Sequence, residues 1–263
     1  MADCDRSGRL RKLLAAMTLS LLFLQLGSSP SPSQTASPEN SPPSDNDAAL
    51  QQAIHDYILA HPEVLIESLQ RAKLKAEQSF AIAVKSKIVA FRKDLVDDPN
   101  APVLGNPTGD VTLVEFFDYR CPYCRQVEPW LQTLIREDPA LRVVEKELPI
   151  LGPASVYAAH VAIAALKQGK HTQFRNALMA KKGNIDEAII LQVAEAAGLD
   201  IDRIKADMNG PDIDSEIRRS MEIAQALGLG GTPGFIVGTE LVPGATDLAT
   251  LKSMVDDARH GLN

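Results

Sequence analysis

Two cysteines separated by two residues, Cys121 and Cys124, lie in the segment FFDYRCPYCRQVEP. Such a pair can clamp a metal ion, close a structural disulfide or exchange electrons with other thiols. A disulfide across so short a loop removes little chain entropy, so a structural staple is the weakest interpretation. Two thiolates supply only half of a closed zinc site, and the histidines do not pair with another ligand at metal-site spacing. The histidines are His55, His61, His160, His171 and His260. We therefore expect thiol chemistry without a metal or a bound cofactor.

The local pattern favours Cys121 as the reactive thiol. A predicted strand ends just before it, and Pro122 suits the first turn of a helix, where its missing N–H costs nothing. Backbone N–H groups and the helix dipole favour negative charge there, which lowers the pKa of a thiol and predicts an exposed nucleophile. Cys124 follows one turn later, where it can attack a mixed disulfide at Cys121. Tyr123 either presents its ring to substrates or packs against the neighbouring loop.

A carboxylate, Glu115, interrupts the segment VTLVEFFD, which is otherwise apolar on both faces until Asp118. Burial in such a strand costs free energy and raises the pKa of a carboxyl group. Glu115 could lie below the active-site helix and accept the proton of Cys124. The alternative places Glu115 at an exposed edge or pairs it with Lys146, while Asp118 caps the turn.

A proline in the segment GGTPGF, Pro233, stands between flexible glycines and the predicted strand FIVG. Proline cannot donate to a central ladder, but a cis Thr232–Pro233 bond would turn the chain sharply. This signal is weak when it is taken alone.

The predicted elements alternate as in a mixed α/β domain. Strand VTLVEFFD, a helix from Pro122 and strand LRVVEKELPI (141–150) make a βαβ unit. Amphipathic helical segments with glycine stops follow over about 152–228. A hairpin-like GFIVGTELVPG and a helix from about Thr246 close the chain, whereas APVLGNPTGD (101–110) is a junction without an element.

FFDYRCPYC after a strand, a helical insert and GTPGF before a hairpin together resemble the DsbA-like branch of the thioredoxin superfamily. The resemblance implies an α/β thioredoxin fold (βαβ…ββα) over 100–263, with a helical insertion at about 152–228, preceded by an N-terminal α-helical extension. It also implies substrate proteins with thiols or disulfides, no cofactor, and a membrane redox partner that re-oxidises or reduces the site.

Roles for single residues follow from the same resemblance. Cys121 matches the nucleophile and Cys124 the resolving thiol of a redox-active disulfide, and Glu115 matches the family's buried acid. The backbone before the cis-proline is positioned to pair with an extended substrate segment. The substrate-binding residues are then Pro122, Tyr123, Thr232 and Pro233.

Two departures from the family pattern leave the direction of exchange open. Pro122-Tyr123 lacks the histidine often present in dedicated oxidases, and Thr232 before the proline resembles disulfide isomerases. Both features tune redox poise. We favour an oxidase that forms disulfides, and the alternative is an oligomeric isomerase or reductase using the same site. A hypothesis of another class is a non-catalytic, chaperone-like binding module.

The beginning of the chain predicts export. A basic start and the apolar run LLAAMTLSLLFLQL indicate a signal peptide over residues 1–29, because a membrane span needs about 20 apolar residues. We expect a periplasmic or otherwise exported protein, with an uncleaved inner-membrane anchor as the alternative. Residues 30–45 are rich in Pro and Ser and predict a disordered linker.

Residues 46–99 predict an N-terminal helical extension. Apolar residues recur every three or four positions from Pro62 to Pro99 without an internal Pro or Gly, which fits one helix of about 35 residues. Long periodic helices often pack against a partner chain, so residues 46–98 predict a homo-oligomer. The alternative is two or three shorter helices folded on the main domain. The net charge of −7 argues against nucleic acid as a partner.

Overall fold

The computed structural model describes residues 45–261. The predicted signal segment (1–29) and nearly all of the predicted linker (30–45) lie outside the described residues. The described chain divides into two units, of which the first ends at Pro62. Helix α1 (Asp45–Ala60) belongs to the first unit, and the remaining elements belong to the second. Within the described part of the chain, none of the helices has the length and apolar character that a membrane span requires.

The second unit confirms the expected βαβ…ββα order with helices inserted between the two halves. Its strands are β1 (Val103–Gly105), β2 (Val111–Phe117), β3 (Leu141–Glu147), β4 (Gly234–Val237) and β5 (Glu240–Pro243). Its helices are α2 (Pro62–Ala90), α3 (Arg92–Leu95), α4 (Pro122–Glu137), α5 (Pro153–Leu166), α6 (His171–Ala180), α7 (Glu187–Ala196), α8 (Ile201–Asp207), α9 (Pro211–Ala226) and α10 (Leu248–Arg259).

Five strands form one sheet in the order β1-β3-β2-β4-β5. Strands β2 and β3 are parallel and are connected by α4, while the other neighbouring strands are antiparallel. The register of the parallel pair places Glu115 directly opposite Glu145. Two like charges therefore meet in the middle of the sheet, which is unfavourable unless a cation compensates them.

Side chains alternate across the central strand β2. Leu113 packs with α4 and α10, and Phe117 packs among the inserted helices. Val114 and Phe116 point to the opposite face, where they join the cluster that includes α9. Glu115, which lies between Leu113 and Phe117 in the alternation, therefore faces the side that carries α4.

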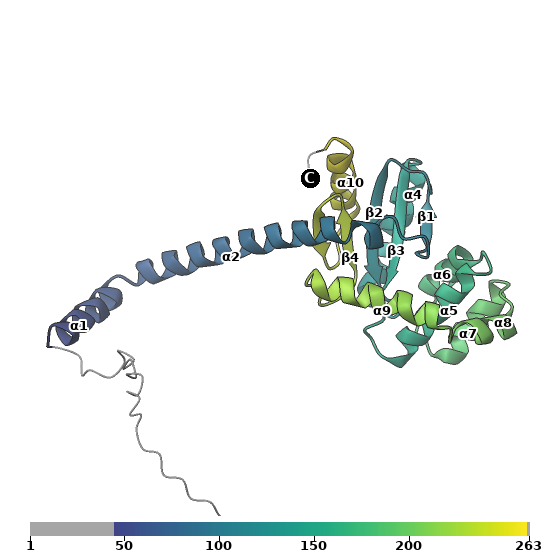
Figure 1. Cartoon of the computed structure of the whole chain (residues 1–263), viewed down its shortest axis with the longest axis horizontal. Helices are drawn as coiled ribbons and strands as arrows, with labels where there is room; N and C mark the ends of the chain where they lie inside the picture. Colours follow the sequence, from purple (N-terminus) through teal and green to yellow (C-terminus); the bar gives the residue numbers. More distant parts are fainter. Residues whose placement is uncertain (1–44, 262–263) are drawn as a thin grey trace, which may run out of the picture. The chain divides into compact units, whose positions relative to one another are not determined.

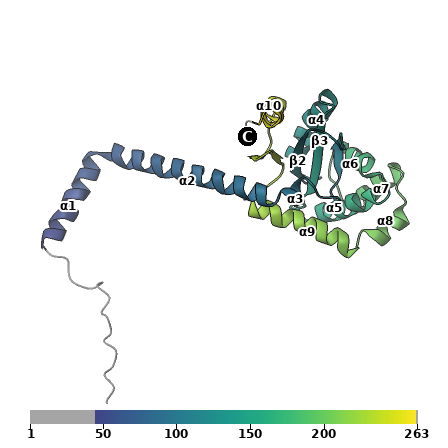
Figure 2. The same cartoon turned by 45° about the horizontal axis from the view of Figure 1, so that its top comes forward.

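Helices cover both faces of the sheet. Helices α4 and α10 lie on one face, and α9 lies on the other with α3 and the end of α2 (Figures 1 and 2). The inserted helices α5 to α8 gather beyond one end of the sheet. Their cluster includes both cysteines, so the active-site segment lies where the insertion meets the sheet.

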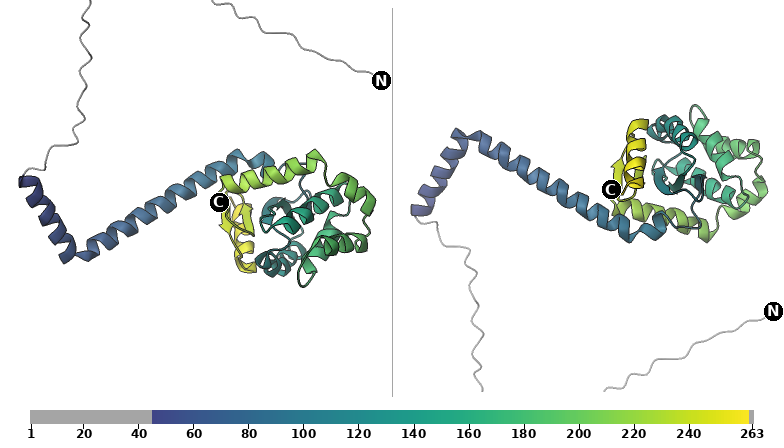
Figure 3. Two further views of the ribbon diagram at one scale, coloured as in Figure 1. Left: turned by 90° about the horizontal axis from the view of Figure 1, so that it is seen from below. Right: turned by 90° about the horizontal axis from the view of Figure 1, so that it is seen from above.

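Helix α2 touches the domain only near its end. Val84 and Ile88 are its buried residues, whereas the residues from Glu63 to Ala83 are exposed. The ammonium group of Lys87 donates to the Ala226 carbonyl at 2.5 Å, which holds α2 beside the end of α9 (Figure 3). The long helix stops at Ala90 with 29 residues, and a separate α3 follows, so the expected single helix of about 35 residues is too long.

The structure corrects further expectations. The segment 101–110 contains strand β1, which is only three residues long and forms through backbone pairing with β3 rather than through an apolar pattern. Strand β3 ends at Glu147 instead of residue 150, and α10 begins at Leu248 because the Asp247 carboxylate caps it through the Thr250 N–H. Lys146 does not pair with Glu115, because the two side chains point to opposite faces.

Lys146 instead anchors the connection between α3 and β1 to the sheet. Its ammonium group lies 2.5 Å from an Asp98 oxygen and 3.1 Å from a Glu216 oxygen. The Lys146 side chain is fully buried, and its partners are about a tenth exposed. This cluster joins the connection before β1, strand β3 and helix α9 by charge rather than by apolar contact.

Replacement of Lys146 by Met leaves Asp98 and Glu216 without their cation. Removing one partner of a buried ion pair costs about 3–5 kcal/mol, and we expect a loss of that size in the free energy of unfolding measured with urea. The matched control is Lys252→Met, because the Lys252–Glu137 pair is about half exposed and solvent screens its interaction, so its loss should change stability much less. Equal losses in the two variants would contradict this account.

Candidate active site

The active-site helix α4 begins at the two predicted cysteines. Cys121 is its N-cap residue with an extended backbone, and Pro122 is the first helical residue. Cys124, one turn later, points into the core and is completely buried. Tyr123, in contrast, is 59% exposed. Cys121 and Cys124 are free thiols in this structure.

A second segment, the turn before β4, meets Cys121 from the other end of the chain. The Thr232–Pro233 peptide bond is cis, and the Cys121 thiol donates to the Thr232 carbonyl over 3.2 Å. The Gly244 N–H donates to the Pro233 carbonyl at 2.8 Å, which ties the turn to the end of the hairpin. Because this turn covers it, Cys121 is only 4% exposed, and the expectation of an exposed thiol is wrong.

The two thiols have opposite electrostatic surroundings. The Cys124 side chain and the backbone N–H groups of Tyr123 and Cys124 stabilise a thiolate at Cys121 and lower its pKa to about 5, although burial opposes the shift. Burial raises the pKa of the Cys124 thiol far above its usual value, and the neighbouring Cys121 and Glu115 reinforce this. Cys121 is therefore a thiolate near neutral pH while Cys124 keeps its proton.

The carboxyl group of Glu115 is 1% exposed, as its place in the strand predicts. One of its oxygens lies 3.4 Å from the Arg175 guanidinium. Burial raises the pKa of Glu115 to about 8, while Arg175 opposes the shift and the carboxylates of Glu145 and Glu128 increase it. A carboxyl group with this pKa can both donate and accept a proton near neutral pH.

The loop between β2 and Cys121 is held by Asp118. Its carboxylate accepts hydrogen bonds from the backbone N–H groups of Arg120 and Leu151 and from the hydroxyl of Ser155. Arg120 in turn donates to the Leu151 carbonyl at 2.6 Å. These bonds hold the loop that leads to Cys121 against the first turn of the insertion. Asp118 therefore does more than cap the turn, which was its expected role.

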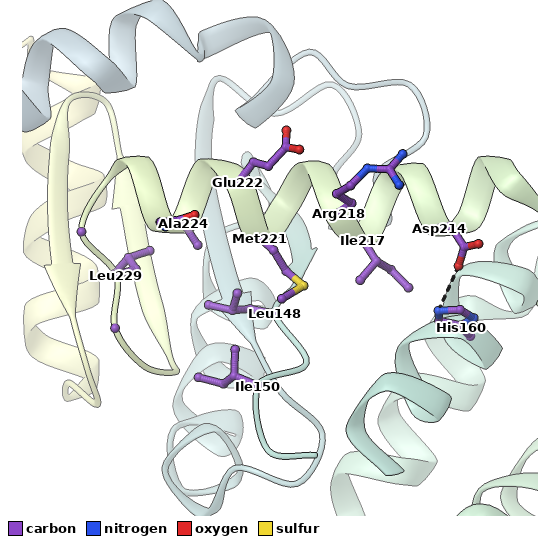
Figure 4. Close-up of a pocket in the computed structure, with 13 residues that line it drawn as sticks. Leu148, Ile150, His160, Asp214, Ile217, Arg218, Met221, Glu222, Ala224 and Leu229 are labelled. Atoms are coloured by element: carbon purple, nitrogen blue, oxygen red, sulfur yellow. Dashed lines mark ion pairs between the residues drawn. The ribbon is translucent and has the colours of Figure 1, made fainter. Parts of the chain in front are cut away.

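Two hollows lie along the segment that leads into the Thr232 turn. The smaller one, of about 460 Å³, lies beside Thr232 and is bordered by Tyr123 and Pro243. The larger one, of about 750 Å³, lies between α9 and the segment after β3, and Leu148, Ile150 and Met221 point into it (Figure 4). Leu229 and Gly230 border both hollows. A largely apolar surface therefore begins beside Thr232 and Tyr123 and continues along α9.

The sequence interpretation missed two contributors to this site. Arg175 and Ser155 come from the helical insertion and meet the thioredoxin-like part only in the folded chain. Arg175 in HTQFRNALMA has the pattern of a polar residue on an amphipathic helix, so no local signal marks its burial. Within the described residues there is no cluster of three or more His, Cys, Asp or Glu side chains arranged to hold a metal.

The pH dependence of alkylation tests the charge state of Cys121. Only the thiolate reacts, so the alkylation rate of the reduced protein should be half-maximal near pH 5. Cys124→Ala removes the neighbouring hydrogen bond and should move the midpoint to higher pH. The pKa of Cys121 is about 5 in the folded protein and about 8.5 in an unfolded chain. The free energy of unfolding of the reduced protein therefore rises as the pH rises from about 5 to about 8.5, and this gain is lost as the pH falls through 5. A midpoint near 8.5 in the unmodified chain would contradict the assignment.

Comparison with family models places this geometry in a known group. The model of the DSBA-like thioredoxin domain matches residues 112–256. The model of the copper resistance protein ScsC N-terminal domain matches residues 47–78. The first match contains the cysteines, the helical insertion and the Thr232–Pro233 turn.

Solved structures support the same grouping. A thioredoxin-like oxidoreductase from Silicibacter pomeroyi is 48% identical, with a TM-score of 0.63 over 64% of this chain and 98% of that chain. The thiol-disulfide exchange protein alpha-DsbA2 from Wolbachia pipientis is 32% identical, with a TM-score of 0.63 over 67% of this chain and 96% of that chain. A periplasmic thioredoxin-like protein from Salmonella enterica serovar Typhimurium is 30% identical, with a TM-score of 0.58 over 65% of this chain and 97% of that chain.

Some curated relatives are longer proteins in which only one segment matches this chain. An Na(+)/H(+) antiporter of Salinispora tropica is 32% identical over 168 residues, which are 62% of this chain and 25% of the antiporter. The chain thus spans about a quarter of the length of such relatives. The match of the domain model to more than half of the sequence, together with the fold and the paired cysteines, establishes that this chain belongs to the family of DSBA-like thioredoxin domains.

Proposed function

We propose that this chain is a protein thiol–disulfide oxidoreductase that uses Cys121 as its nucleophile and Cys124 as the resolving thiol. The observation that carries this proposal is the asymmetry of the two thiols. Cys121 has a pKa of about 5 and lies at the start of a helix beside the Thr232 carbonyl, whereas the buried Cys124 retains its proton. Such a pair is suited to exchange, because a thiol of low pKa is ionised at neutral pH and is a good leaving group.

In the direction of oxidation, the cycle starts from the Cys121–Cys124 disulfide. A substrate thiolate attacks the Cys121 sulfur, the bond between the two cysteines breaks, and Cys124 leaves as a thiolate that takes up a proton. A second substrate thiolate then attacks the substrate sulfur of the mixed disulfide. The substrate leaves with a new disulfide, and Cys121 leaves as a thiolate, so the enzyme has gained the two electrons that the substrate lost.

We favour the oxidase over the isomerase because of the stabilised thiolate. Whatever stabilises the reduced form makes the disulfide form a stronger oxidant. The alternative, reduction or isomerisation, uses the same atoms in reverse, with Cys121 attacking a wrong disulfide and Cys124 resolving the mixed disulfide. The exposed apolar residues of α1 and α2 are the reason to retain this alternative. If they join copies of the chain, the multimer would surround a misfolded client with several sites.

The two hollows along the Thr232 turn and α9 support an extended polypeptide segment as the substrate. Tyr123, Ile150 and Met221 are between 41% and 59% exposed and border the two hollows that meet at Leu229. A chain that passes Thr232 would place its cysteine at Cys121 and its apolar side chains in these hollows. Pro122 and Pro233, on either side of Cys121, would restrict the position of that segment.

The N-terminal helices support self-association through residues 46–98. Helix α1 and the first two thirds of α2 carry exposed apolar side chains, and a monomer would leave them in water. They are Leu50, Ile54, Tyr57, Leu59, Val64, Leu65, Ile66, Leu69, Leu74, Phe80 and Ile82. We propose a homo-oligomer in which these helices pack on their copies.

We further propose the organisation and location that the sequence predicts. Residues 1–29 serve as an export signal, 30–45 as a linker, 46–99 as the extension, and 100–263 as the catalytic domain. A periplasmic location suits a catalytic disulfide, which needs an oxidising compartment. A membrane redox partner would then re-oxidise or reduce Cys121–Cys124 after each turnover.

A single-turnover assay tests the proposed chemistry. The disulfide form of the protein, mixed with an equal amount of a reduced unfolded protein, should transfer its disulfide, which is measured as the loss of substrate thiols. Cys121→Ala should abolish the transfer, whereas the matched control His260→Ala, at the exposed C-cap position after α10, should retain it. Retained function in Cys121→Ala would support the non-catalytic binding module and overturn the redox proposal.

Sedimentation velocity tests the proposed oligomer. The protein with residues 46–98 should sediment as a multimer, and Leu65→Lys combined with Leu69→Lys should reduce it to a monomer, because two charges would have to be buried between helices. Gln78→Lys adds a charge on the same helix at a polar position and should leave the multimer intact. A monomer in the unmodified chain would refute self-association.

A further inference from the structure

A single guanidinium from the helical insertion contacts three carboxylates of the thioredoxin-like part. Arg175 on α6 donates from Nε to Glu145 on β3 at 2.5 Å, and from one terminal nitrogen to Glu128 on α4. Its other terminal nitrogen lies 3.4 Å from Glu115 on β2. The side chain of Arg175 is completely buried, and its guanidinium also lies over the ring of Phe117.

We infer that Arg175 is a positioning residue for thiol–disulfide exchange, which holds Glu115 where that group can exchange a proton with Cys124. This inference rests on the proposed function, because it assigns a role within the reaction of Cys121 and Cys124. It concerns a residue of the insertion, far from the cysteines in the sequence.

The charge balance of the cluster indicates a role in proton exchange in addition to a structural one. Three carboxylates meet one guanidinium, so their charges cannot all be compensated when all are ionised. Nearby His171 does not supply a second cation, because burial and Arg175 lower its pKa to about 3. Burial also raises the pKa of Glu147, next to Tyr119, so that this carboxyl group tends to stay neutral. One proton must therefore be shared within the cluster near neutral pH.

Glu115 is the member best placed to carry that proton. It has the longest contact with Arg175, whereas Glu145 and Glu128 form the shorter bonds. Its pKa of about 8 exceeds that of Glu145, which burial raises only to about 6. The charged groups that face Glu115 are Arg175 from α6, Glu145 from β3, and Glu128 with the Cys124 thiol from α4.

The exchange reaction needs both protonation states of Glu115. When a substrate thiolate breaks the Cys121–Cys124 bond, the departing Cys124 thiolate takes a proton from the Glu115 carboxylic acid. When Cys124 attacks a mixed disulfide, it first gives its proton to the Glu115 carboxylate. The Cys121–Cys124 bond then forms, the bond between Cys121 and the substrate sulfur breaks, and the substrate leaves as a thiolate.

Arg175 is what keeps the ionised state of Glu115 accessible. Burial and the two neighbouring carboxylates all favour the neutral acid, and the guanidinium is the cation that opposes them. Without that cation, Glu115 would remain protonated throughout the neutral range. Attack by Cys124 would then lack a proton acceptor, while the low pKa of Cys121, which depends on other groups, would be unaffected.

The test follows the step in which Cys124 acts. The full chain carrying a mixed disulfide between Cys121 and glutathione is prepared, and the release of glutathione is measured as a function of pH. We expect the unmodified chain to show an inflection near pH 8 that Glu115→Gln removes. Arg175→Met should move the inflection upward and slow release at neutral pH by about tenfold for each unit of that shift.

Two further variants keep the test decisive. Arg175→Met combined with Glu128→Gln and Glu145→Gln removes the uncompensated charges, so this chain should fold even where the single variant does not, and its inflection should lie higher than that of Glu128→Gln combined with Glu145→Gln, which retains Arg175. Lys146→Met is the matched control, because it removes a buried cation with two carboxylate partners on the opposite face of the sheet. It should lower stability without moving the inflection.

The outcomes separate this inference from the proposed function. An unchanged inflection in a folded Arg175 variant that still releases glutathione would overturn the role of Arg175 and leave the exchange activity intact. A chain that forms no mixed disulfide at Cys121, or never releases glutathione in its unmodified form, would overturn the exchange activity itself. A raised inflection in the Arg175 variants alone would establish the positioning role.

Discussion

The structure depends on one buried charge cluster that joins the central strands, the active-site helix and the insertion. The parallel register of β2 and β3 brings Glu115 and Glu145 side by side on the buried face of the sheet, and Glu128 on α4 adds a third carboxylate. Arg175 from the insertion is the cation that compensates them. The helical insertion therefore does more than cover one end of the sheet, because without it the central strands would carry uncompensated buried charge.

The reactive pair shares α4 with Glu128 of this cluster, and its asymmetry follows from where each thiol is placed. Cys121 stands at the helix start, where backbone N–H groups stabilise a thiolate. Cys124 lies one turn deeper, between the apolar core and the charge of Glu115, where a thiolate is disfavoured. The Thr232 turn then closes over Cys121 and creates the apolar border on which a polypeptide can lie. Segments far apart in the sequence, strand β2 with Glu115, the start of α4 and the Thr232 turn, thus make one site.

Residues with a strong local signal were predictable from the sequence. The spacing of Cys121 and Cys124 after an apolar strand, and the single carboxylate in that strand, were enough to locate the two thiols and the buried acid. Arg175 was not predictable, because its partners are distributed over three elements and their register is unknown before the sheet is formed. The partners of Lys146 were misjudged for the same reason, since alternation along β3 sends neighbouring side chains to opposite faces. Strand β1 escaped notice because three residues carry no periodicity.

The central claim is that Cys121 and Cys124 form an exchange site in which the stabilised Cys121 thiolate favours the reduced form and makes the disulfide an oxidant. Equilibration of the purified chain with glutathione buffers measures this directly as the reduction potential of the pair. The account predicts a reduction potential of about −120 mV, close to that of DsbA. A value near the about −270 mV of thioredoxin would contradict it, because the pair would then act as a reductant.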